Sequence, residues 1–374
     1  MTIFFKNISN VKIIYGNNAK KNIFNHIKNY KCLLVCTQRC INEIKKDKFL
    51  KKINNLENID KIIIPSSEIS LYKKKFIYKQ IVNKNFEYFI AIGGGSIIDL
   101  TKIYNAMLSF GKKEFDISAL TKKSFPIKKI DLKKIIALPT TSGSGSEVTS
   151  FATIWDKKNK KKYSYTSIDN LPKIAIVDPS LTSLNSEETY IPSALDALNQ
   201  SFESLWNVNA TRKTKYYSSI AIKMGLNAFT DYFEGNEKRF FKNISKCSVL
   251  SGCLINITKT ALCHSLSYPL TLRYSVNHGM ACAFTMLEVM RYNRKYKENL
   301  FLKLENDLNI KNLDNKLDMI LKNLKVKTQV KKKLRTFKNI ENLIDQMLDK
   351  KRALNNIAPV NKTVVREIIY KSWY

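Results

Sequence analysis

The chain has 374 residues, of which 44% are hydrophobic and 11% aromatic, so it is long enough for two domains and is neither disordered nor a coiled coil. Its formal net charge of +33 comes mostly from lysines scattered along the chain, including the runs at 157–162 and 331–333. Because these runs are typical of solvated faces, no nucleic-acid partner is expected.

Short apolar runs that end in turn residues alternate with amphipathic stretches up to about residue 180. The apolar runs are typical of buried strands and lie at 32–37, 61–67, 88–96, 134–142 and 174–180. Helical patterns such as 19–30 fall between several of them. This alternation predicts a Rossmann-like α/β domain with a mostly parallel, doubly wound sheet.

Strand signals become sparse from about residue 188 onward, where long helical patterns such as 218–233, 246–267 and 317–337 follow one another. The sequence therefore predicts an α/β domain over residues 1–182 and an all-α domain over residues 183–374.

Two polar loops follow predicted strands of the first domain. "GGGSIID" places three glycines between a strand and a helix, which suits a bound phosphate but equally suits a tight turn. "PTTSGSGSEVTS" then adds hydroxyls and amides at the end of a second strand. Loops at the carboxyl ends of strands in one sheet face a common crevice, which favours a dinucleotide site. The candidate cofactor-binding residues of these loops are Gly93, Gly94, Gly95, Ser96, Asp99, Thr140, Thr141, Ser144 and Ser146.

The helical half contains a candidate metal site. Asp196 and Gln200 lie four residues apart in "SALDALNQSFESLW", which places both on one face of a helix. His264 and His278 are two of the three histidines in the chain. Polar residues at this spacing are often a solvated face, and a buried histidine is often a core residue. Together, however, these side chains are candidates for the nitrogen and oxygen ligands of a divalent ion.

These motifs resemble the iron-containing, or group III, alcohol dehydrogenase family. "GGGSIID", "PTTSGSGSEVT", "DALNQSFES" and "HSLSYPLTLRYSVNHG" occur in the order of that family over nearly the whole chain. The resemblance implies a dehydroquinate synthase-like fold, an N-terminal dinucleotide domain, a helical metal- and substrate-binding domain, and a divalent metal such as Fe(II) or Zn(II). It also implies metal ligands at Asp196, Gln200, His264 and His278, with Gln200 replacing the usual histidine.

Within the family the sequence is most similar to the phosphonoacetaldehyde reductase subgroup, through segments such as "SEVTSFATIWD" and "KRALNNIAPV". This similarity implies that a reduced nicotinamide converts phosphonoacetaldehyde to 2-hydroxyethylphosphonate. Two alternatives stay open: an alcohol dehydrogenase acting on another small aldehyde, anionic aldehydes included, and a non-catalytic binding homologue.

The same resemblance suggests catalytic and substrate-binding residues. Tyr268 stands where other members of the family have a catalytic histidine, so Tyr268 and the ligand His264 are the catalytic candidates; packing is the alternative role for Tyr268. Arg273, between the two histidines, is the main candidate for binding a phosphonate, with a structural ion pair as the alternative. The secondary substrate candidates are Lys259, Lys162 and Ser150.

Cofactor preference is expected to depend on the end of the strand 32–37. NAD-preferring relatives often have an aspartate there, whereas this chain has Thr37, with Arg39 nearby. A missing carboxylate and a nearby guanidinium tolerate a 2'-phosphate, so NADPH is favoured modestly over NADH.

The seven cysteines form no C-x-x-C pair and are expected to be reduced and mostly buried. The first residues do not resemble a secretory signal, and no apolar run reaches eighteen residues, so we expect a cytoplasmic protein without a membrane partner. A homodimer is one assembly that the resemblance allows.

Overall fold

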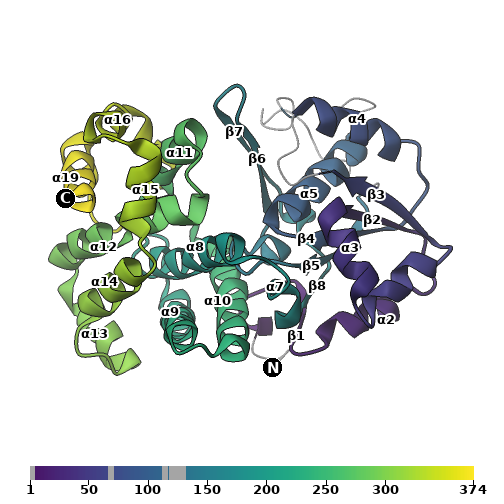
Figure 1. The fold of residues 1–374 in the computed structure, drawn as a ribbon, viewed down its shortest axis with the longest axis horizontal. Helices are drawn as coiled ribbons and strands as arrows, with labels where there is room; N and C mark the ends of the chain where they lie inside the picture. Colours follow the sequence, from purple (N-terminus) through teal and green to yellow (C-terminus); the bar gives the residue numbers. More distant parts are fainter. Residues whose placement is uncertain (1–4, 66–70, 112–116, 118–131) are drawn as a thin grey trace. The chain divides into compact units, whose positions relative to one another are not determined.

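The computed structural model describes residues 5–65, 71–111, 117 and 132–374. The chain divides into two compact units, Met1–Ser186 and Glu187–Tyr374 (Figure 1). The boundary predicted after residue 182 lies close to this division. Each unit has its own hydrophobic core, so each is described separately.

A six-stranded sheet forms the centre of the first unit. All of its described pairings are parallel, as the sequence predicts. In spatial order the strands are β1 (Lys12–Tyr15), β8 (Ile174–Val177), β5 (Lys134–Pro139), β4 (Tyr88–Gly93), β2 (Cys32–Thr37) and β3 (Ile59–Ile64). The chain turns back between β2 and β4, because β3 continues outward from β2 while β4 begins on its other side. Ligands of open α/β sheets bind at such a reversal, beyond the carboxyl ends of the strands.

Helices cover both faces of this sheet, which explains why the central strands β2 and β4 are almost entirely apolar. Leu33 and Val35 of β2 belong to the core that lies under α4 (Leu71–Ile81) and α5 (Gly95–Ser109). Cys32, Leu34 and Cys36 belong to the core on the opposite face. The shorter elements of this face and of the connections are η1 (Ala19–Ile23), α2 (Phe24–Ile27), α3 (Gln38–Lys46), η2 (Leu50–Asn55), η5 (Ile168–Asn170) and α7 (Pro179–Thr182).

Two features of the first unit differ from the pattern in the sequence. The amphipathic stretch 19–30 forms the 3-10 helix η1 followed by the single turn α2, instead of one helix. A separate antiparallel hairpin, β6 (Phe151–Asp156) with β7 (Lys161–Thr166), follows the short η4 (Ser146–Val148). The hairpin was not predicted because the residues of β7 are mostly polar.

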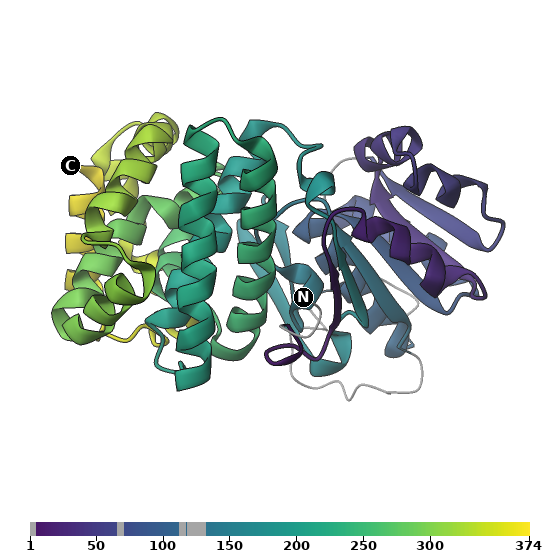
Figure 2. The same ribbon diagram turned by 90° about the horizontal axis from the view of Figure 1, so that it is seen from below.

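The second unit is helical around a single core (Figure 2). Its longest helices are α8 (Glu187–Leu205), α9 (Arg212–Phe233), α10 (Glu237–Thr258), α11 (Leu262–Tyr274) and α12 (His278–Tyr296), and α8 packs against α9, α10 and α12. The remaining helices are α13 (Glu298–Leu308), α14 (Leu313–Asn323), α15 (Val326–Leu334), α16 (Phe337–Glu341), α17 (Ile344–Met347), α18 (Lys350–Ala353) and α19 (Lys362–Trp373). Across the described parts of the chain, no helix combines the length and the apolar character needed to span a bilayer.

Two stretches predicted as continuous helices are broken in the structure. The stretch 246–267 is divided between α10 and α11 at Lys259, where φ is 66°. The stretch 317–337 is broken at Lys325, where φ is 52°, and again at Arg335, where φ is 69°. Helical periodicity continues through a single left-handed residue, so the pattern alone does not reveal such breaks. The first break places the start of α11 beside α8, where Glu203 accepts from the amides of Ala261 and His264.

Candidate metal centre and cofactor loops

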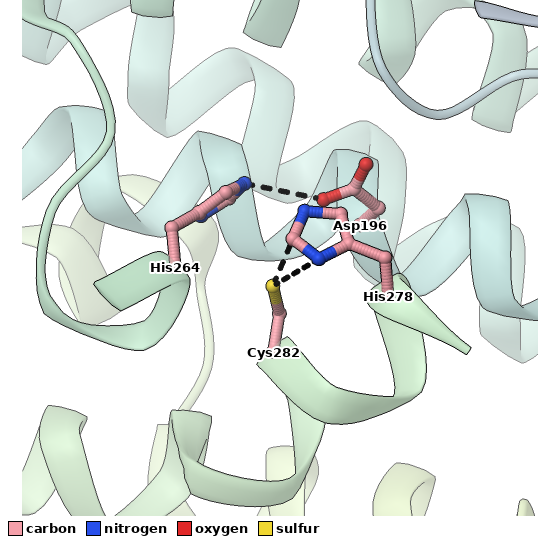
Figure 3. A group of neighbouring side chains, drawn as sticks. All are labelled: Asp196, His264, His278 and Cys282. Atoms are coloured by element: carbon pink, nitrogen blue, oxygen red, sulfur yellow. Dashed lines mark hydrogen bonds and ion pairs between the residues drawn. The ribbon is translucent and has the colours of Figure 1, made fainter. Parts of the chain in front are cut away.

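Four side chains from three helices converge in the helical unit. Asp196 comes from α8, His264 from α11, and His278 and Cys282 from α12 (Figure 3). One potential ligand atom from each lies within 4.8 Å of the others. Asp196, His264 and Cys282 are buried, and His278 is half-buried. The sequence analysis had selected three of these four residues as ligands.

A glycine allows α12 to begin directly against α8. A Cβ atom at Gly279 would lie 1.8 Å from the carbonyl oxygen of Pro192 and 3.2 Å from Cβ of Asp196. A residue with a side chain cannot occupy this position without separating the helices. Gly279 therefore fixes the neighbouring His278 beside Asp196.

Glu203, one helical turn beyond Gln200, positions His264. Its side chain is fully buried and accepts hydrogen bonds from the backbone amides of Ala261, at 2.9 Å, and His264, at 3.1 Å. These bonds satisfy amides at the start of α11 that no helical carbonyl can reach. Oε2 of Glu203 also lies 2.6 Å from Nδ1 of His264. This contact directs the imidazole Nε2 atom toward Asp196.

The space between His264 and Asp196 suits a cation. Nε2 of His264 lies 3.4 Å from Oδ1 of Asp196, and this buried carboxylate oxygen has no hydrogen bond partner. Burial lowers the pKa of His264, but Glu203 and Asp196 together raise it to about 10. Burial raises the pKa of Asp196, but His264 and His278 outweigh this effect and hold it below its usual value. Two acceptor atoms that face each other in a buried site need a proton or a metal ion between them, so these residues fit a divalent ion.

Gln200 supports Asp196 from the same helix. The side chain is buried, and its carboxamide oxygen accepts a hydrogen bond from the Ser251 hydroxyl at 3.2 Å. The Gln200 side chain also contributes to the lowered pKa of Asp196. Its predicted role as a ligand stays a prediction.

Tyr268 lies next to the converging group, whereas Arg273 does not. The Tyr268 ring is buried and stacks on His278, with ring centroids 6.1 Å apart. Arg273 is exposed at the end of α11, and its Nε donates to Gln346 at 2.5 Å. Nine residues separate Arg273 from His264, which places the two on opposite faces of an ideal helix. Substrate binding by Arg273 therefore has no support from this placement and stays a prediction.

The other predicted substrate residues lie in separate places. Nζ of Lys259 donates to the carbonyl oxygen of Asn256 at the end of α10. Nζ of Lys162 lies 5.4 Å from the centroid of the Trp155 ring in the β6–β7 hairpin. Ser150 is buried just before β6.

The two polar loops of the first unit lie side by side, because β4 pairs with β5 up to Gly93 and Pro139. The Thr140 amide donates to the Gly93 carbonyl at 3.0 Å. A Cβ atom at Gly95 would lie only 2.1 Å from Oγ of Ser144. The start of α5 and the second loop therefore form one continuous surface at the end of the sheet, as expected for a dinucleotide site.

A buried lysine that the sequence analysis missed holds the second loop in place. Lys102 of α5 is fully buried, and its Nζ donates to the carbonyl oxygens of Ser146 at 2.6 Å, Thr149 at 2.8 Å and Phe151 at 3.0 Å. Burial lowers the pKa of Lys102 to about 8, despite the charges of Asp99 and Glu147. The only sequence signal is the position of Lys102 one turn after Asp99 in a buried helix.

Asp99 belongs to the same cluster. Its carboxylate accepts hydrogen bonds from the Ser146 hydroxyl and, at 2.8 Å, from the Thr153 amide. Asp99 therefore joins α5 to the second loop and to the hairpin. Its predicted contact with the cofactor stays a prediction.

Thr37 and Arg39 lie at the end of β2, beside the reversal in strand order. Oγ1 of Thr37 caps α3 by accepting from the Cys40 amide at 3.1 Å. Arg39 is exposed and donates to the carbonyl oxygen of Leu184 and the side chain of Asn185. Asn185 in turn donates to the Thr140 carbonyl, which links Arg39 to the second loop.

The doubly wound α/β unit and the helical unit together define the fold class as that of the iron-containing alcohol dehydrogenases. Residues 10–179 match the family model for iron-containing alcohol dehydrogenase, and residues 190–373 match that for the C-terminal part of the family. The chain therefore belongs to the iron-containing alcohol dehydrogenase family.

Individual relatives share 30% or less of their aligned residues with this chain. The phosphonoacetaldehyde reductase of Streptomyces viridochromogenes is 30% identical over 207 residues, 54% of this chain and 52% of that enzyme. The NADPH-dependent butanol dehydrogenase of Clostridium saccharobutylicum is 26% identical over 67% of this chain and 65% of its own. The chain thus spans about half the length of the first relative and about two thirds of the second.

A solved structure shares the fold over the whole chain. Sulfoacetaldehyde reductase from Bifidobacterium kashiwanohense, crystallised with NAD+, has a TM-score of 0.83 and 22% identity over 98% of this chain and 97% of its own.

Proposed function

We propose that this protein reduces a small anionic aldehyde, phosphonoacetaldehyde, to 2-hydroxyethylphosphonate with a reduced nicotinamide cofactor. The observation that carries the proposal is the group of Asp196, His264 and His278, in which a buried carboxylate oxygen without a hydrogen bond faces an imidazole nitrogen at 3.4 Å. The similarity to a phosphonoacetaldehyde reductase supports the substrate. The net charge of +33 also favours the approach of an anion.

Reduction adds a hydride to the aldehyde carbon and a proton to its oxygen. A divalent ion, either Fe(II) or Zn(II), would supply Lewis-acid stabilisation of the negative charge that develops on that oxygen. Asp196, His264 and His278 would hold the ion, with Gln200 beside Asp196. Tyr268 would donate the proton, which its ring contact with His278 supports.

The nicotinamide cofactor would bind at the carboxyl ends of β2, β4 and β5 in the first unit. The adjacent loops at Gly93–Asp99 and Thr140–Ser146 supply amides and hydroxyls for its phosphates. We propose NADPH over NADH, because β2 ends in Thr37 without a carboxylate that would repel a 2'-phosphate.

A rate comparison between an anionic and an uncharged aldehyde tests the proposal. Consumption of NADPH is followed with phosphonoacetaldehyde and with propionaldehyde, before and after treatment with a chelator and readdition of Fe(II) or Zn(II). We expect kcat/KM for phosphonoacetaldehyde to exceed that for propionaldehyde by at least about 100-fold, since an anion site left empty loses its charged hydrogen bonds. Full activity in chelator-treated, metal-free protein would refute the metal centre.

The second candidate is an alcohol dehydrogenase for uncharged aldehydes, which the similarity to a butanol dehydrogenase favours. In that case propionaldehyde or butyraldehyde is reduced at least as well as phosphonoacetaldehyde. If the protein binds cofactor but oxidises it with none of these aldehydes, both phosphonoacetaldehyde and the uncharged aldehydes are excluded as substrates, and a binding homologue becomes the hypothesis to test.

A further inference from the structure

Cys282 is the member of the converging group that the sequence analysis did not select. It follows His278 by one turn of α12, so both side chains lie on the same face of that helix. Its sulfur lies 3.9 Å from Nε2 and 4.0 Å from Nδ1 of His278, and the residue is fully buried (Figure 3). Asp196 and His264 complete the group within 4.8 Å.

Gln200, by contrast, interacts with residues other than the candidate ion. Its carboxamide oxygen accepts from the Ser251 hydroxyl at 3.2 Å, which directs the oxygen toward α10. The Gln200 side chain also contributes to the lowered pKa of Asp196.

We propose that Cys282, as a thiolate, is the fourth protein ligand of the metal, and that Gln200 is a positioning residue for Asp196. The inference rests on the metal centre proposed above. On binding, the Cys282 thiol loses its proton to solvent and forms a sulfur–metal bond.

Charge and size both favour this ligand set. The Cys282 thiolate would place a second negative charge directly on the divalent ion beside that of Asp196, which the neutral Gln200 carboxamide cannot do. Ligand atoms around a tetrahedral ion, with bonds of about 2.0 to 2.3 Å, lie about 3.3 to 3.8 Å apart. The present group, within 4.8 Å, therefore needs only a contraction of about 1 Å by side-chain rotation. A fourth ligand does not close the site, because catalytic zinc can expand to five ligands.

The thiolate also determines which ion is preferred. Sulfur ligands select zinc over ferrous iron, since zinc is the softer ion and stands higher in the affinity series. We therefore expect zinc to be preferred, although the family is named for iron.

Cobalt substitution tests the ligand directly. Co(II) is added to metal-free, full-length protein, and its visible bands report binding while a near-ultraviolet sulfur-to-cobalt band reports thiolate ligation. We expect both kinds of band in the wild type and in Gln200→Ala. Cys282→Ser should keep the visible bands but lose the near-ultraviolet band. Cys247→Ser, which changes a buried cysteine bonded to Ser201 and outside the group, is the matched control and should keep both.

Zinc competition with a chromophoric chelator gives a second measure. Cys282→Ser should bind zinc more than about 10-fold more weakly than the wild type. Changing a residue that only contacts a ligand already lowers metal affinity by about this factor, so losing a ligand should lower it further. Cys282→Ala serves if the serine variant does not fold.

The outcomes separate this inference from the proposed function. If cobalt gives no visible bands in the wild type, the metal centre itself is wrong, and the ligand assignment fails with it. If visible bands appear without a sulfur band, or the sulfur band survives in Cys282→Ser, only the assignment of Cys282 is overturned.

Discussion

Tyr268 is buried against His278, one helical turn after His264. Its position beside the candidate ligands is compatible with proton donation and also with packing. If it donates the proton, Tyr268→Phe should lower kcat about 100-fold or more, because general acid catalysis contributes about 10²- to 10⁴-fold. Steady-state kinetics together with metal analysis check this. An unchanged kcat in fully metallated Tyr268→Phe would leave the phenol with a packing role only.

Glu203 acts on the metal centre through His264. Replacing its carboxylate by an amide removes the strong acceptor that lies 2.6 Å from Nδ1, so the imidazole is held less firmly. We expect Glu203→Gln to weaken zinc affinity about 10- to 100-fold, measured by chelator competition. Glu234→Gln, at an exposed helix end, is the control and should have no effect. Equal affinities for the two variants would show that Glu203 serves only to cap α11.

At the scale of elements, the contact between α8 and α12 depends on Gly279. Gly279→Ala places a methyl group 1.8 Å from the Pro192 carbonyl oxygen and must push the helices apart. Overpacking of this kind costs about 1 to 3 kcal/mol, so the melting temperature should fall by several degrees. Zinc affinity should fall as well, because His278 moves with the start of α12.

Gly235→Ala provides the comparison for this variant. Gly235 has a φ of +73° but open space around its Cβ position. Its replacement introduces backbone strain of about 1 kcal/mol without separating α8 from α12, so zinc affinity should stay at the wild-type value. Wild-type zinc affinity in Gly279→Ala would contradict the role assigned to this glycine.

Lys102 joins α5 to the second polar loop and to the start of the hairpin. Lys102→Met leaves three carbonyl oxygens without their donor and removes the positive charge beside Asp99 and Glu147. Breaking a buried charge cluster in this way costs about 3 to 5 kcal/mol. We expect a lower melting temperature and, because the loop loosens, a KM for NADPH raised about 10-fold with a smaller change in kcat. Lys79→Met, at an exposed position of α4, should change neither quantity.

At the scale of the whole molecule, stability should depend on pH through Glu147. Burial raises the pKa of this carboxyl from 4.5 to about 7, and Lys102 offsets only part of the effect. Since the folded pKa lies above the unfolded one, the stabilising contribution is complete below about pH 4.5 and is lost as pH rises through about 7.

Glu147→Gln stays neutral at every pH and should not show this loss. Melting curves from pH 5 to pH 8 should therefore show that the melting temperature of the variant rises by several degrees relative to that of the wild type as the pH increases. A constant difference across this range would mean that Glu147 titrates normally in the folded protein.

Much of the fold followed from the sequence. The apolar runs at 88–96 and 134–142 predicted the parallel sheet, because a strand covered on both faces has apolar residues at nearly all of its positions. Because both polar loops follow strands of one parallel sheet, the sequence also predicted that they lie next to each other, as they do. Periodicity did not reveal the helix break at Lys259, which a single left-handed residue creates, or the polar strand β7.

The sequence by itself determined the residue types available for chemistry: the resemblance and the spacing selected Asp196, His264 and His278, and the structure brings them together. Only the tertiary structure decided how they are held. Glu203 reaches a helix start 61 residues further along the chain, and Cys282 enters the group because Gly279 lets α12 begin against α8. Periodicity records which face of an element is buried, whereas the convergence of side chains from different helices depends on packing that no local pattern encodes.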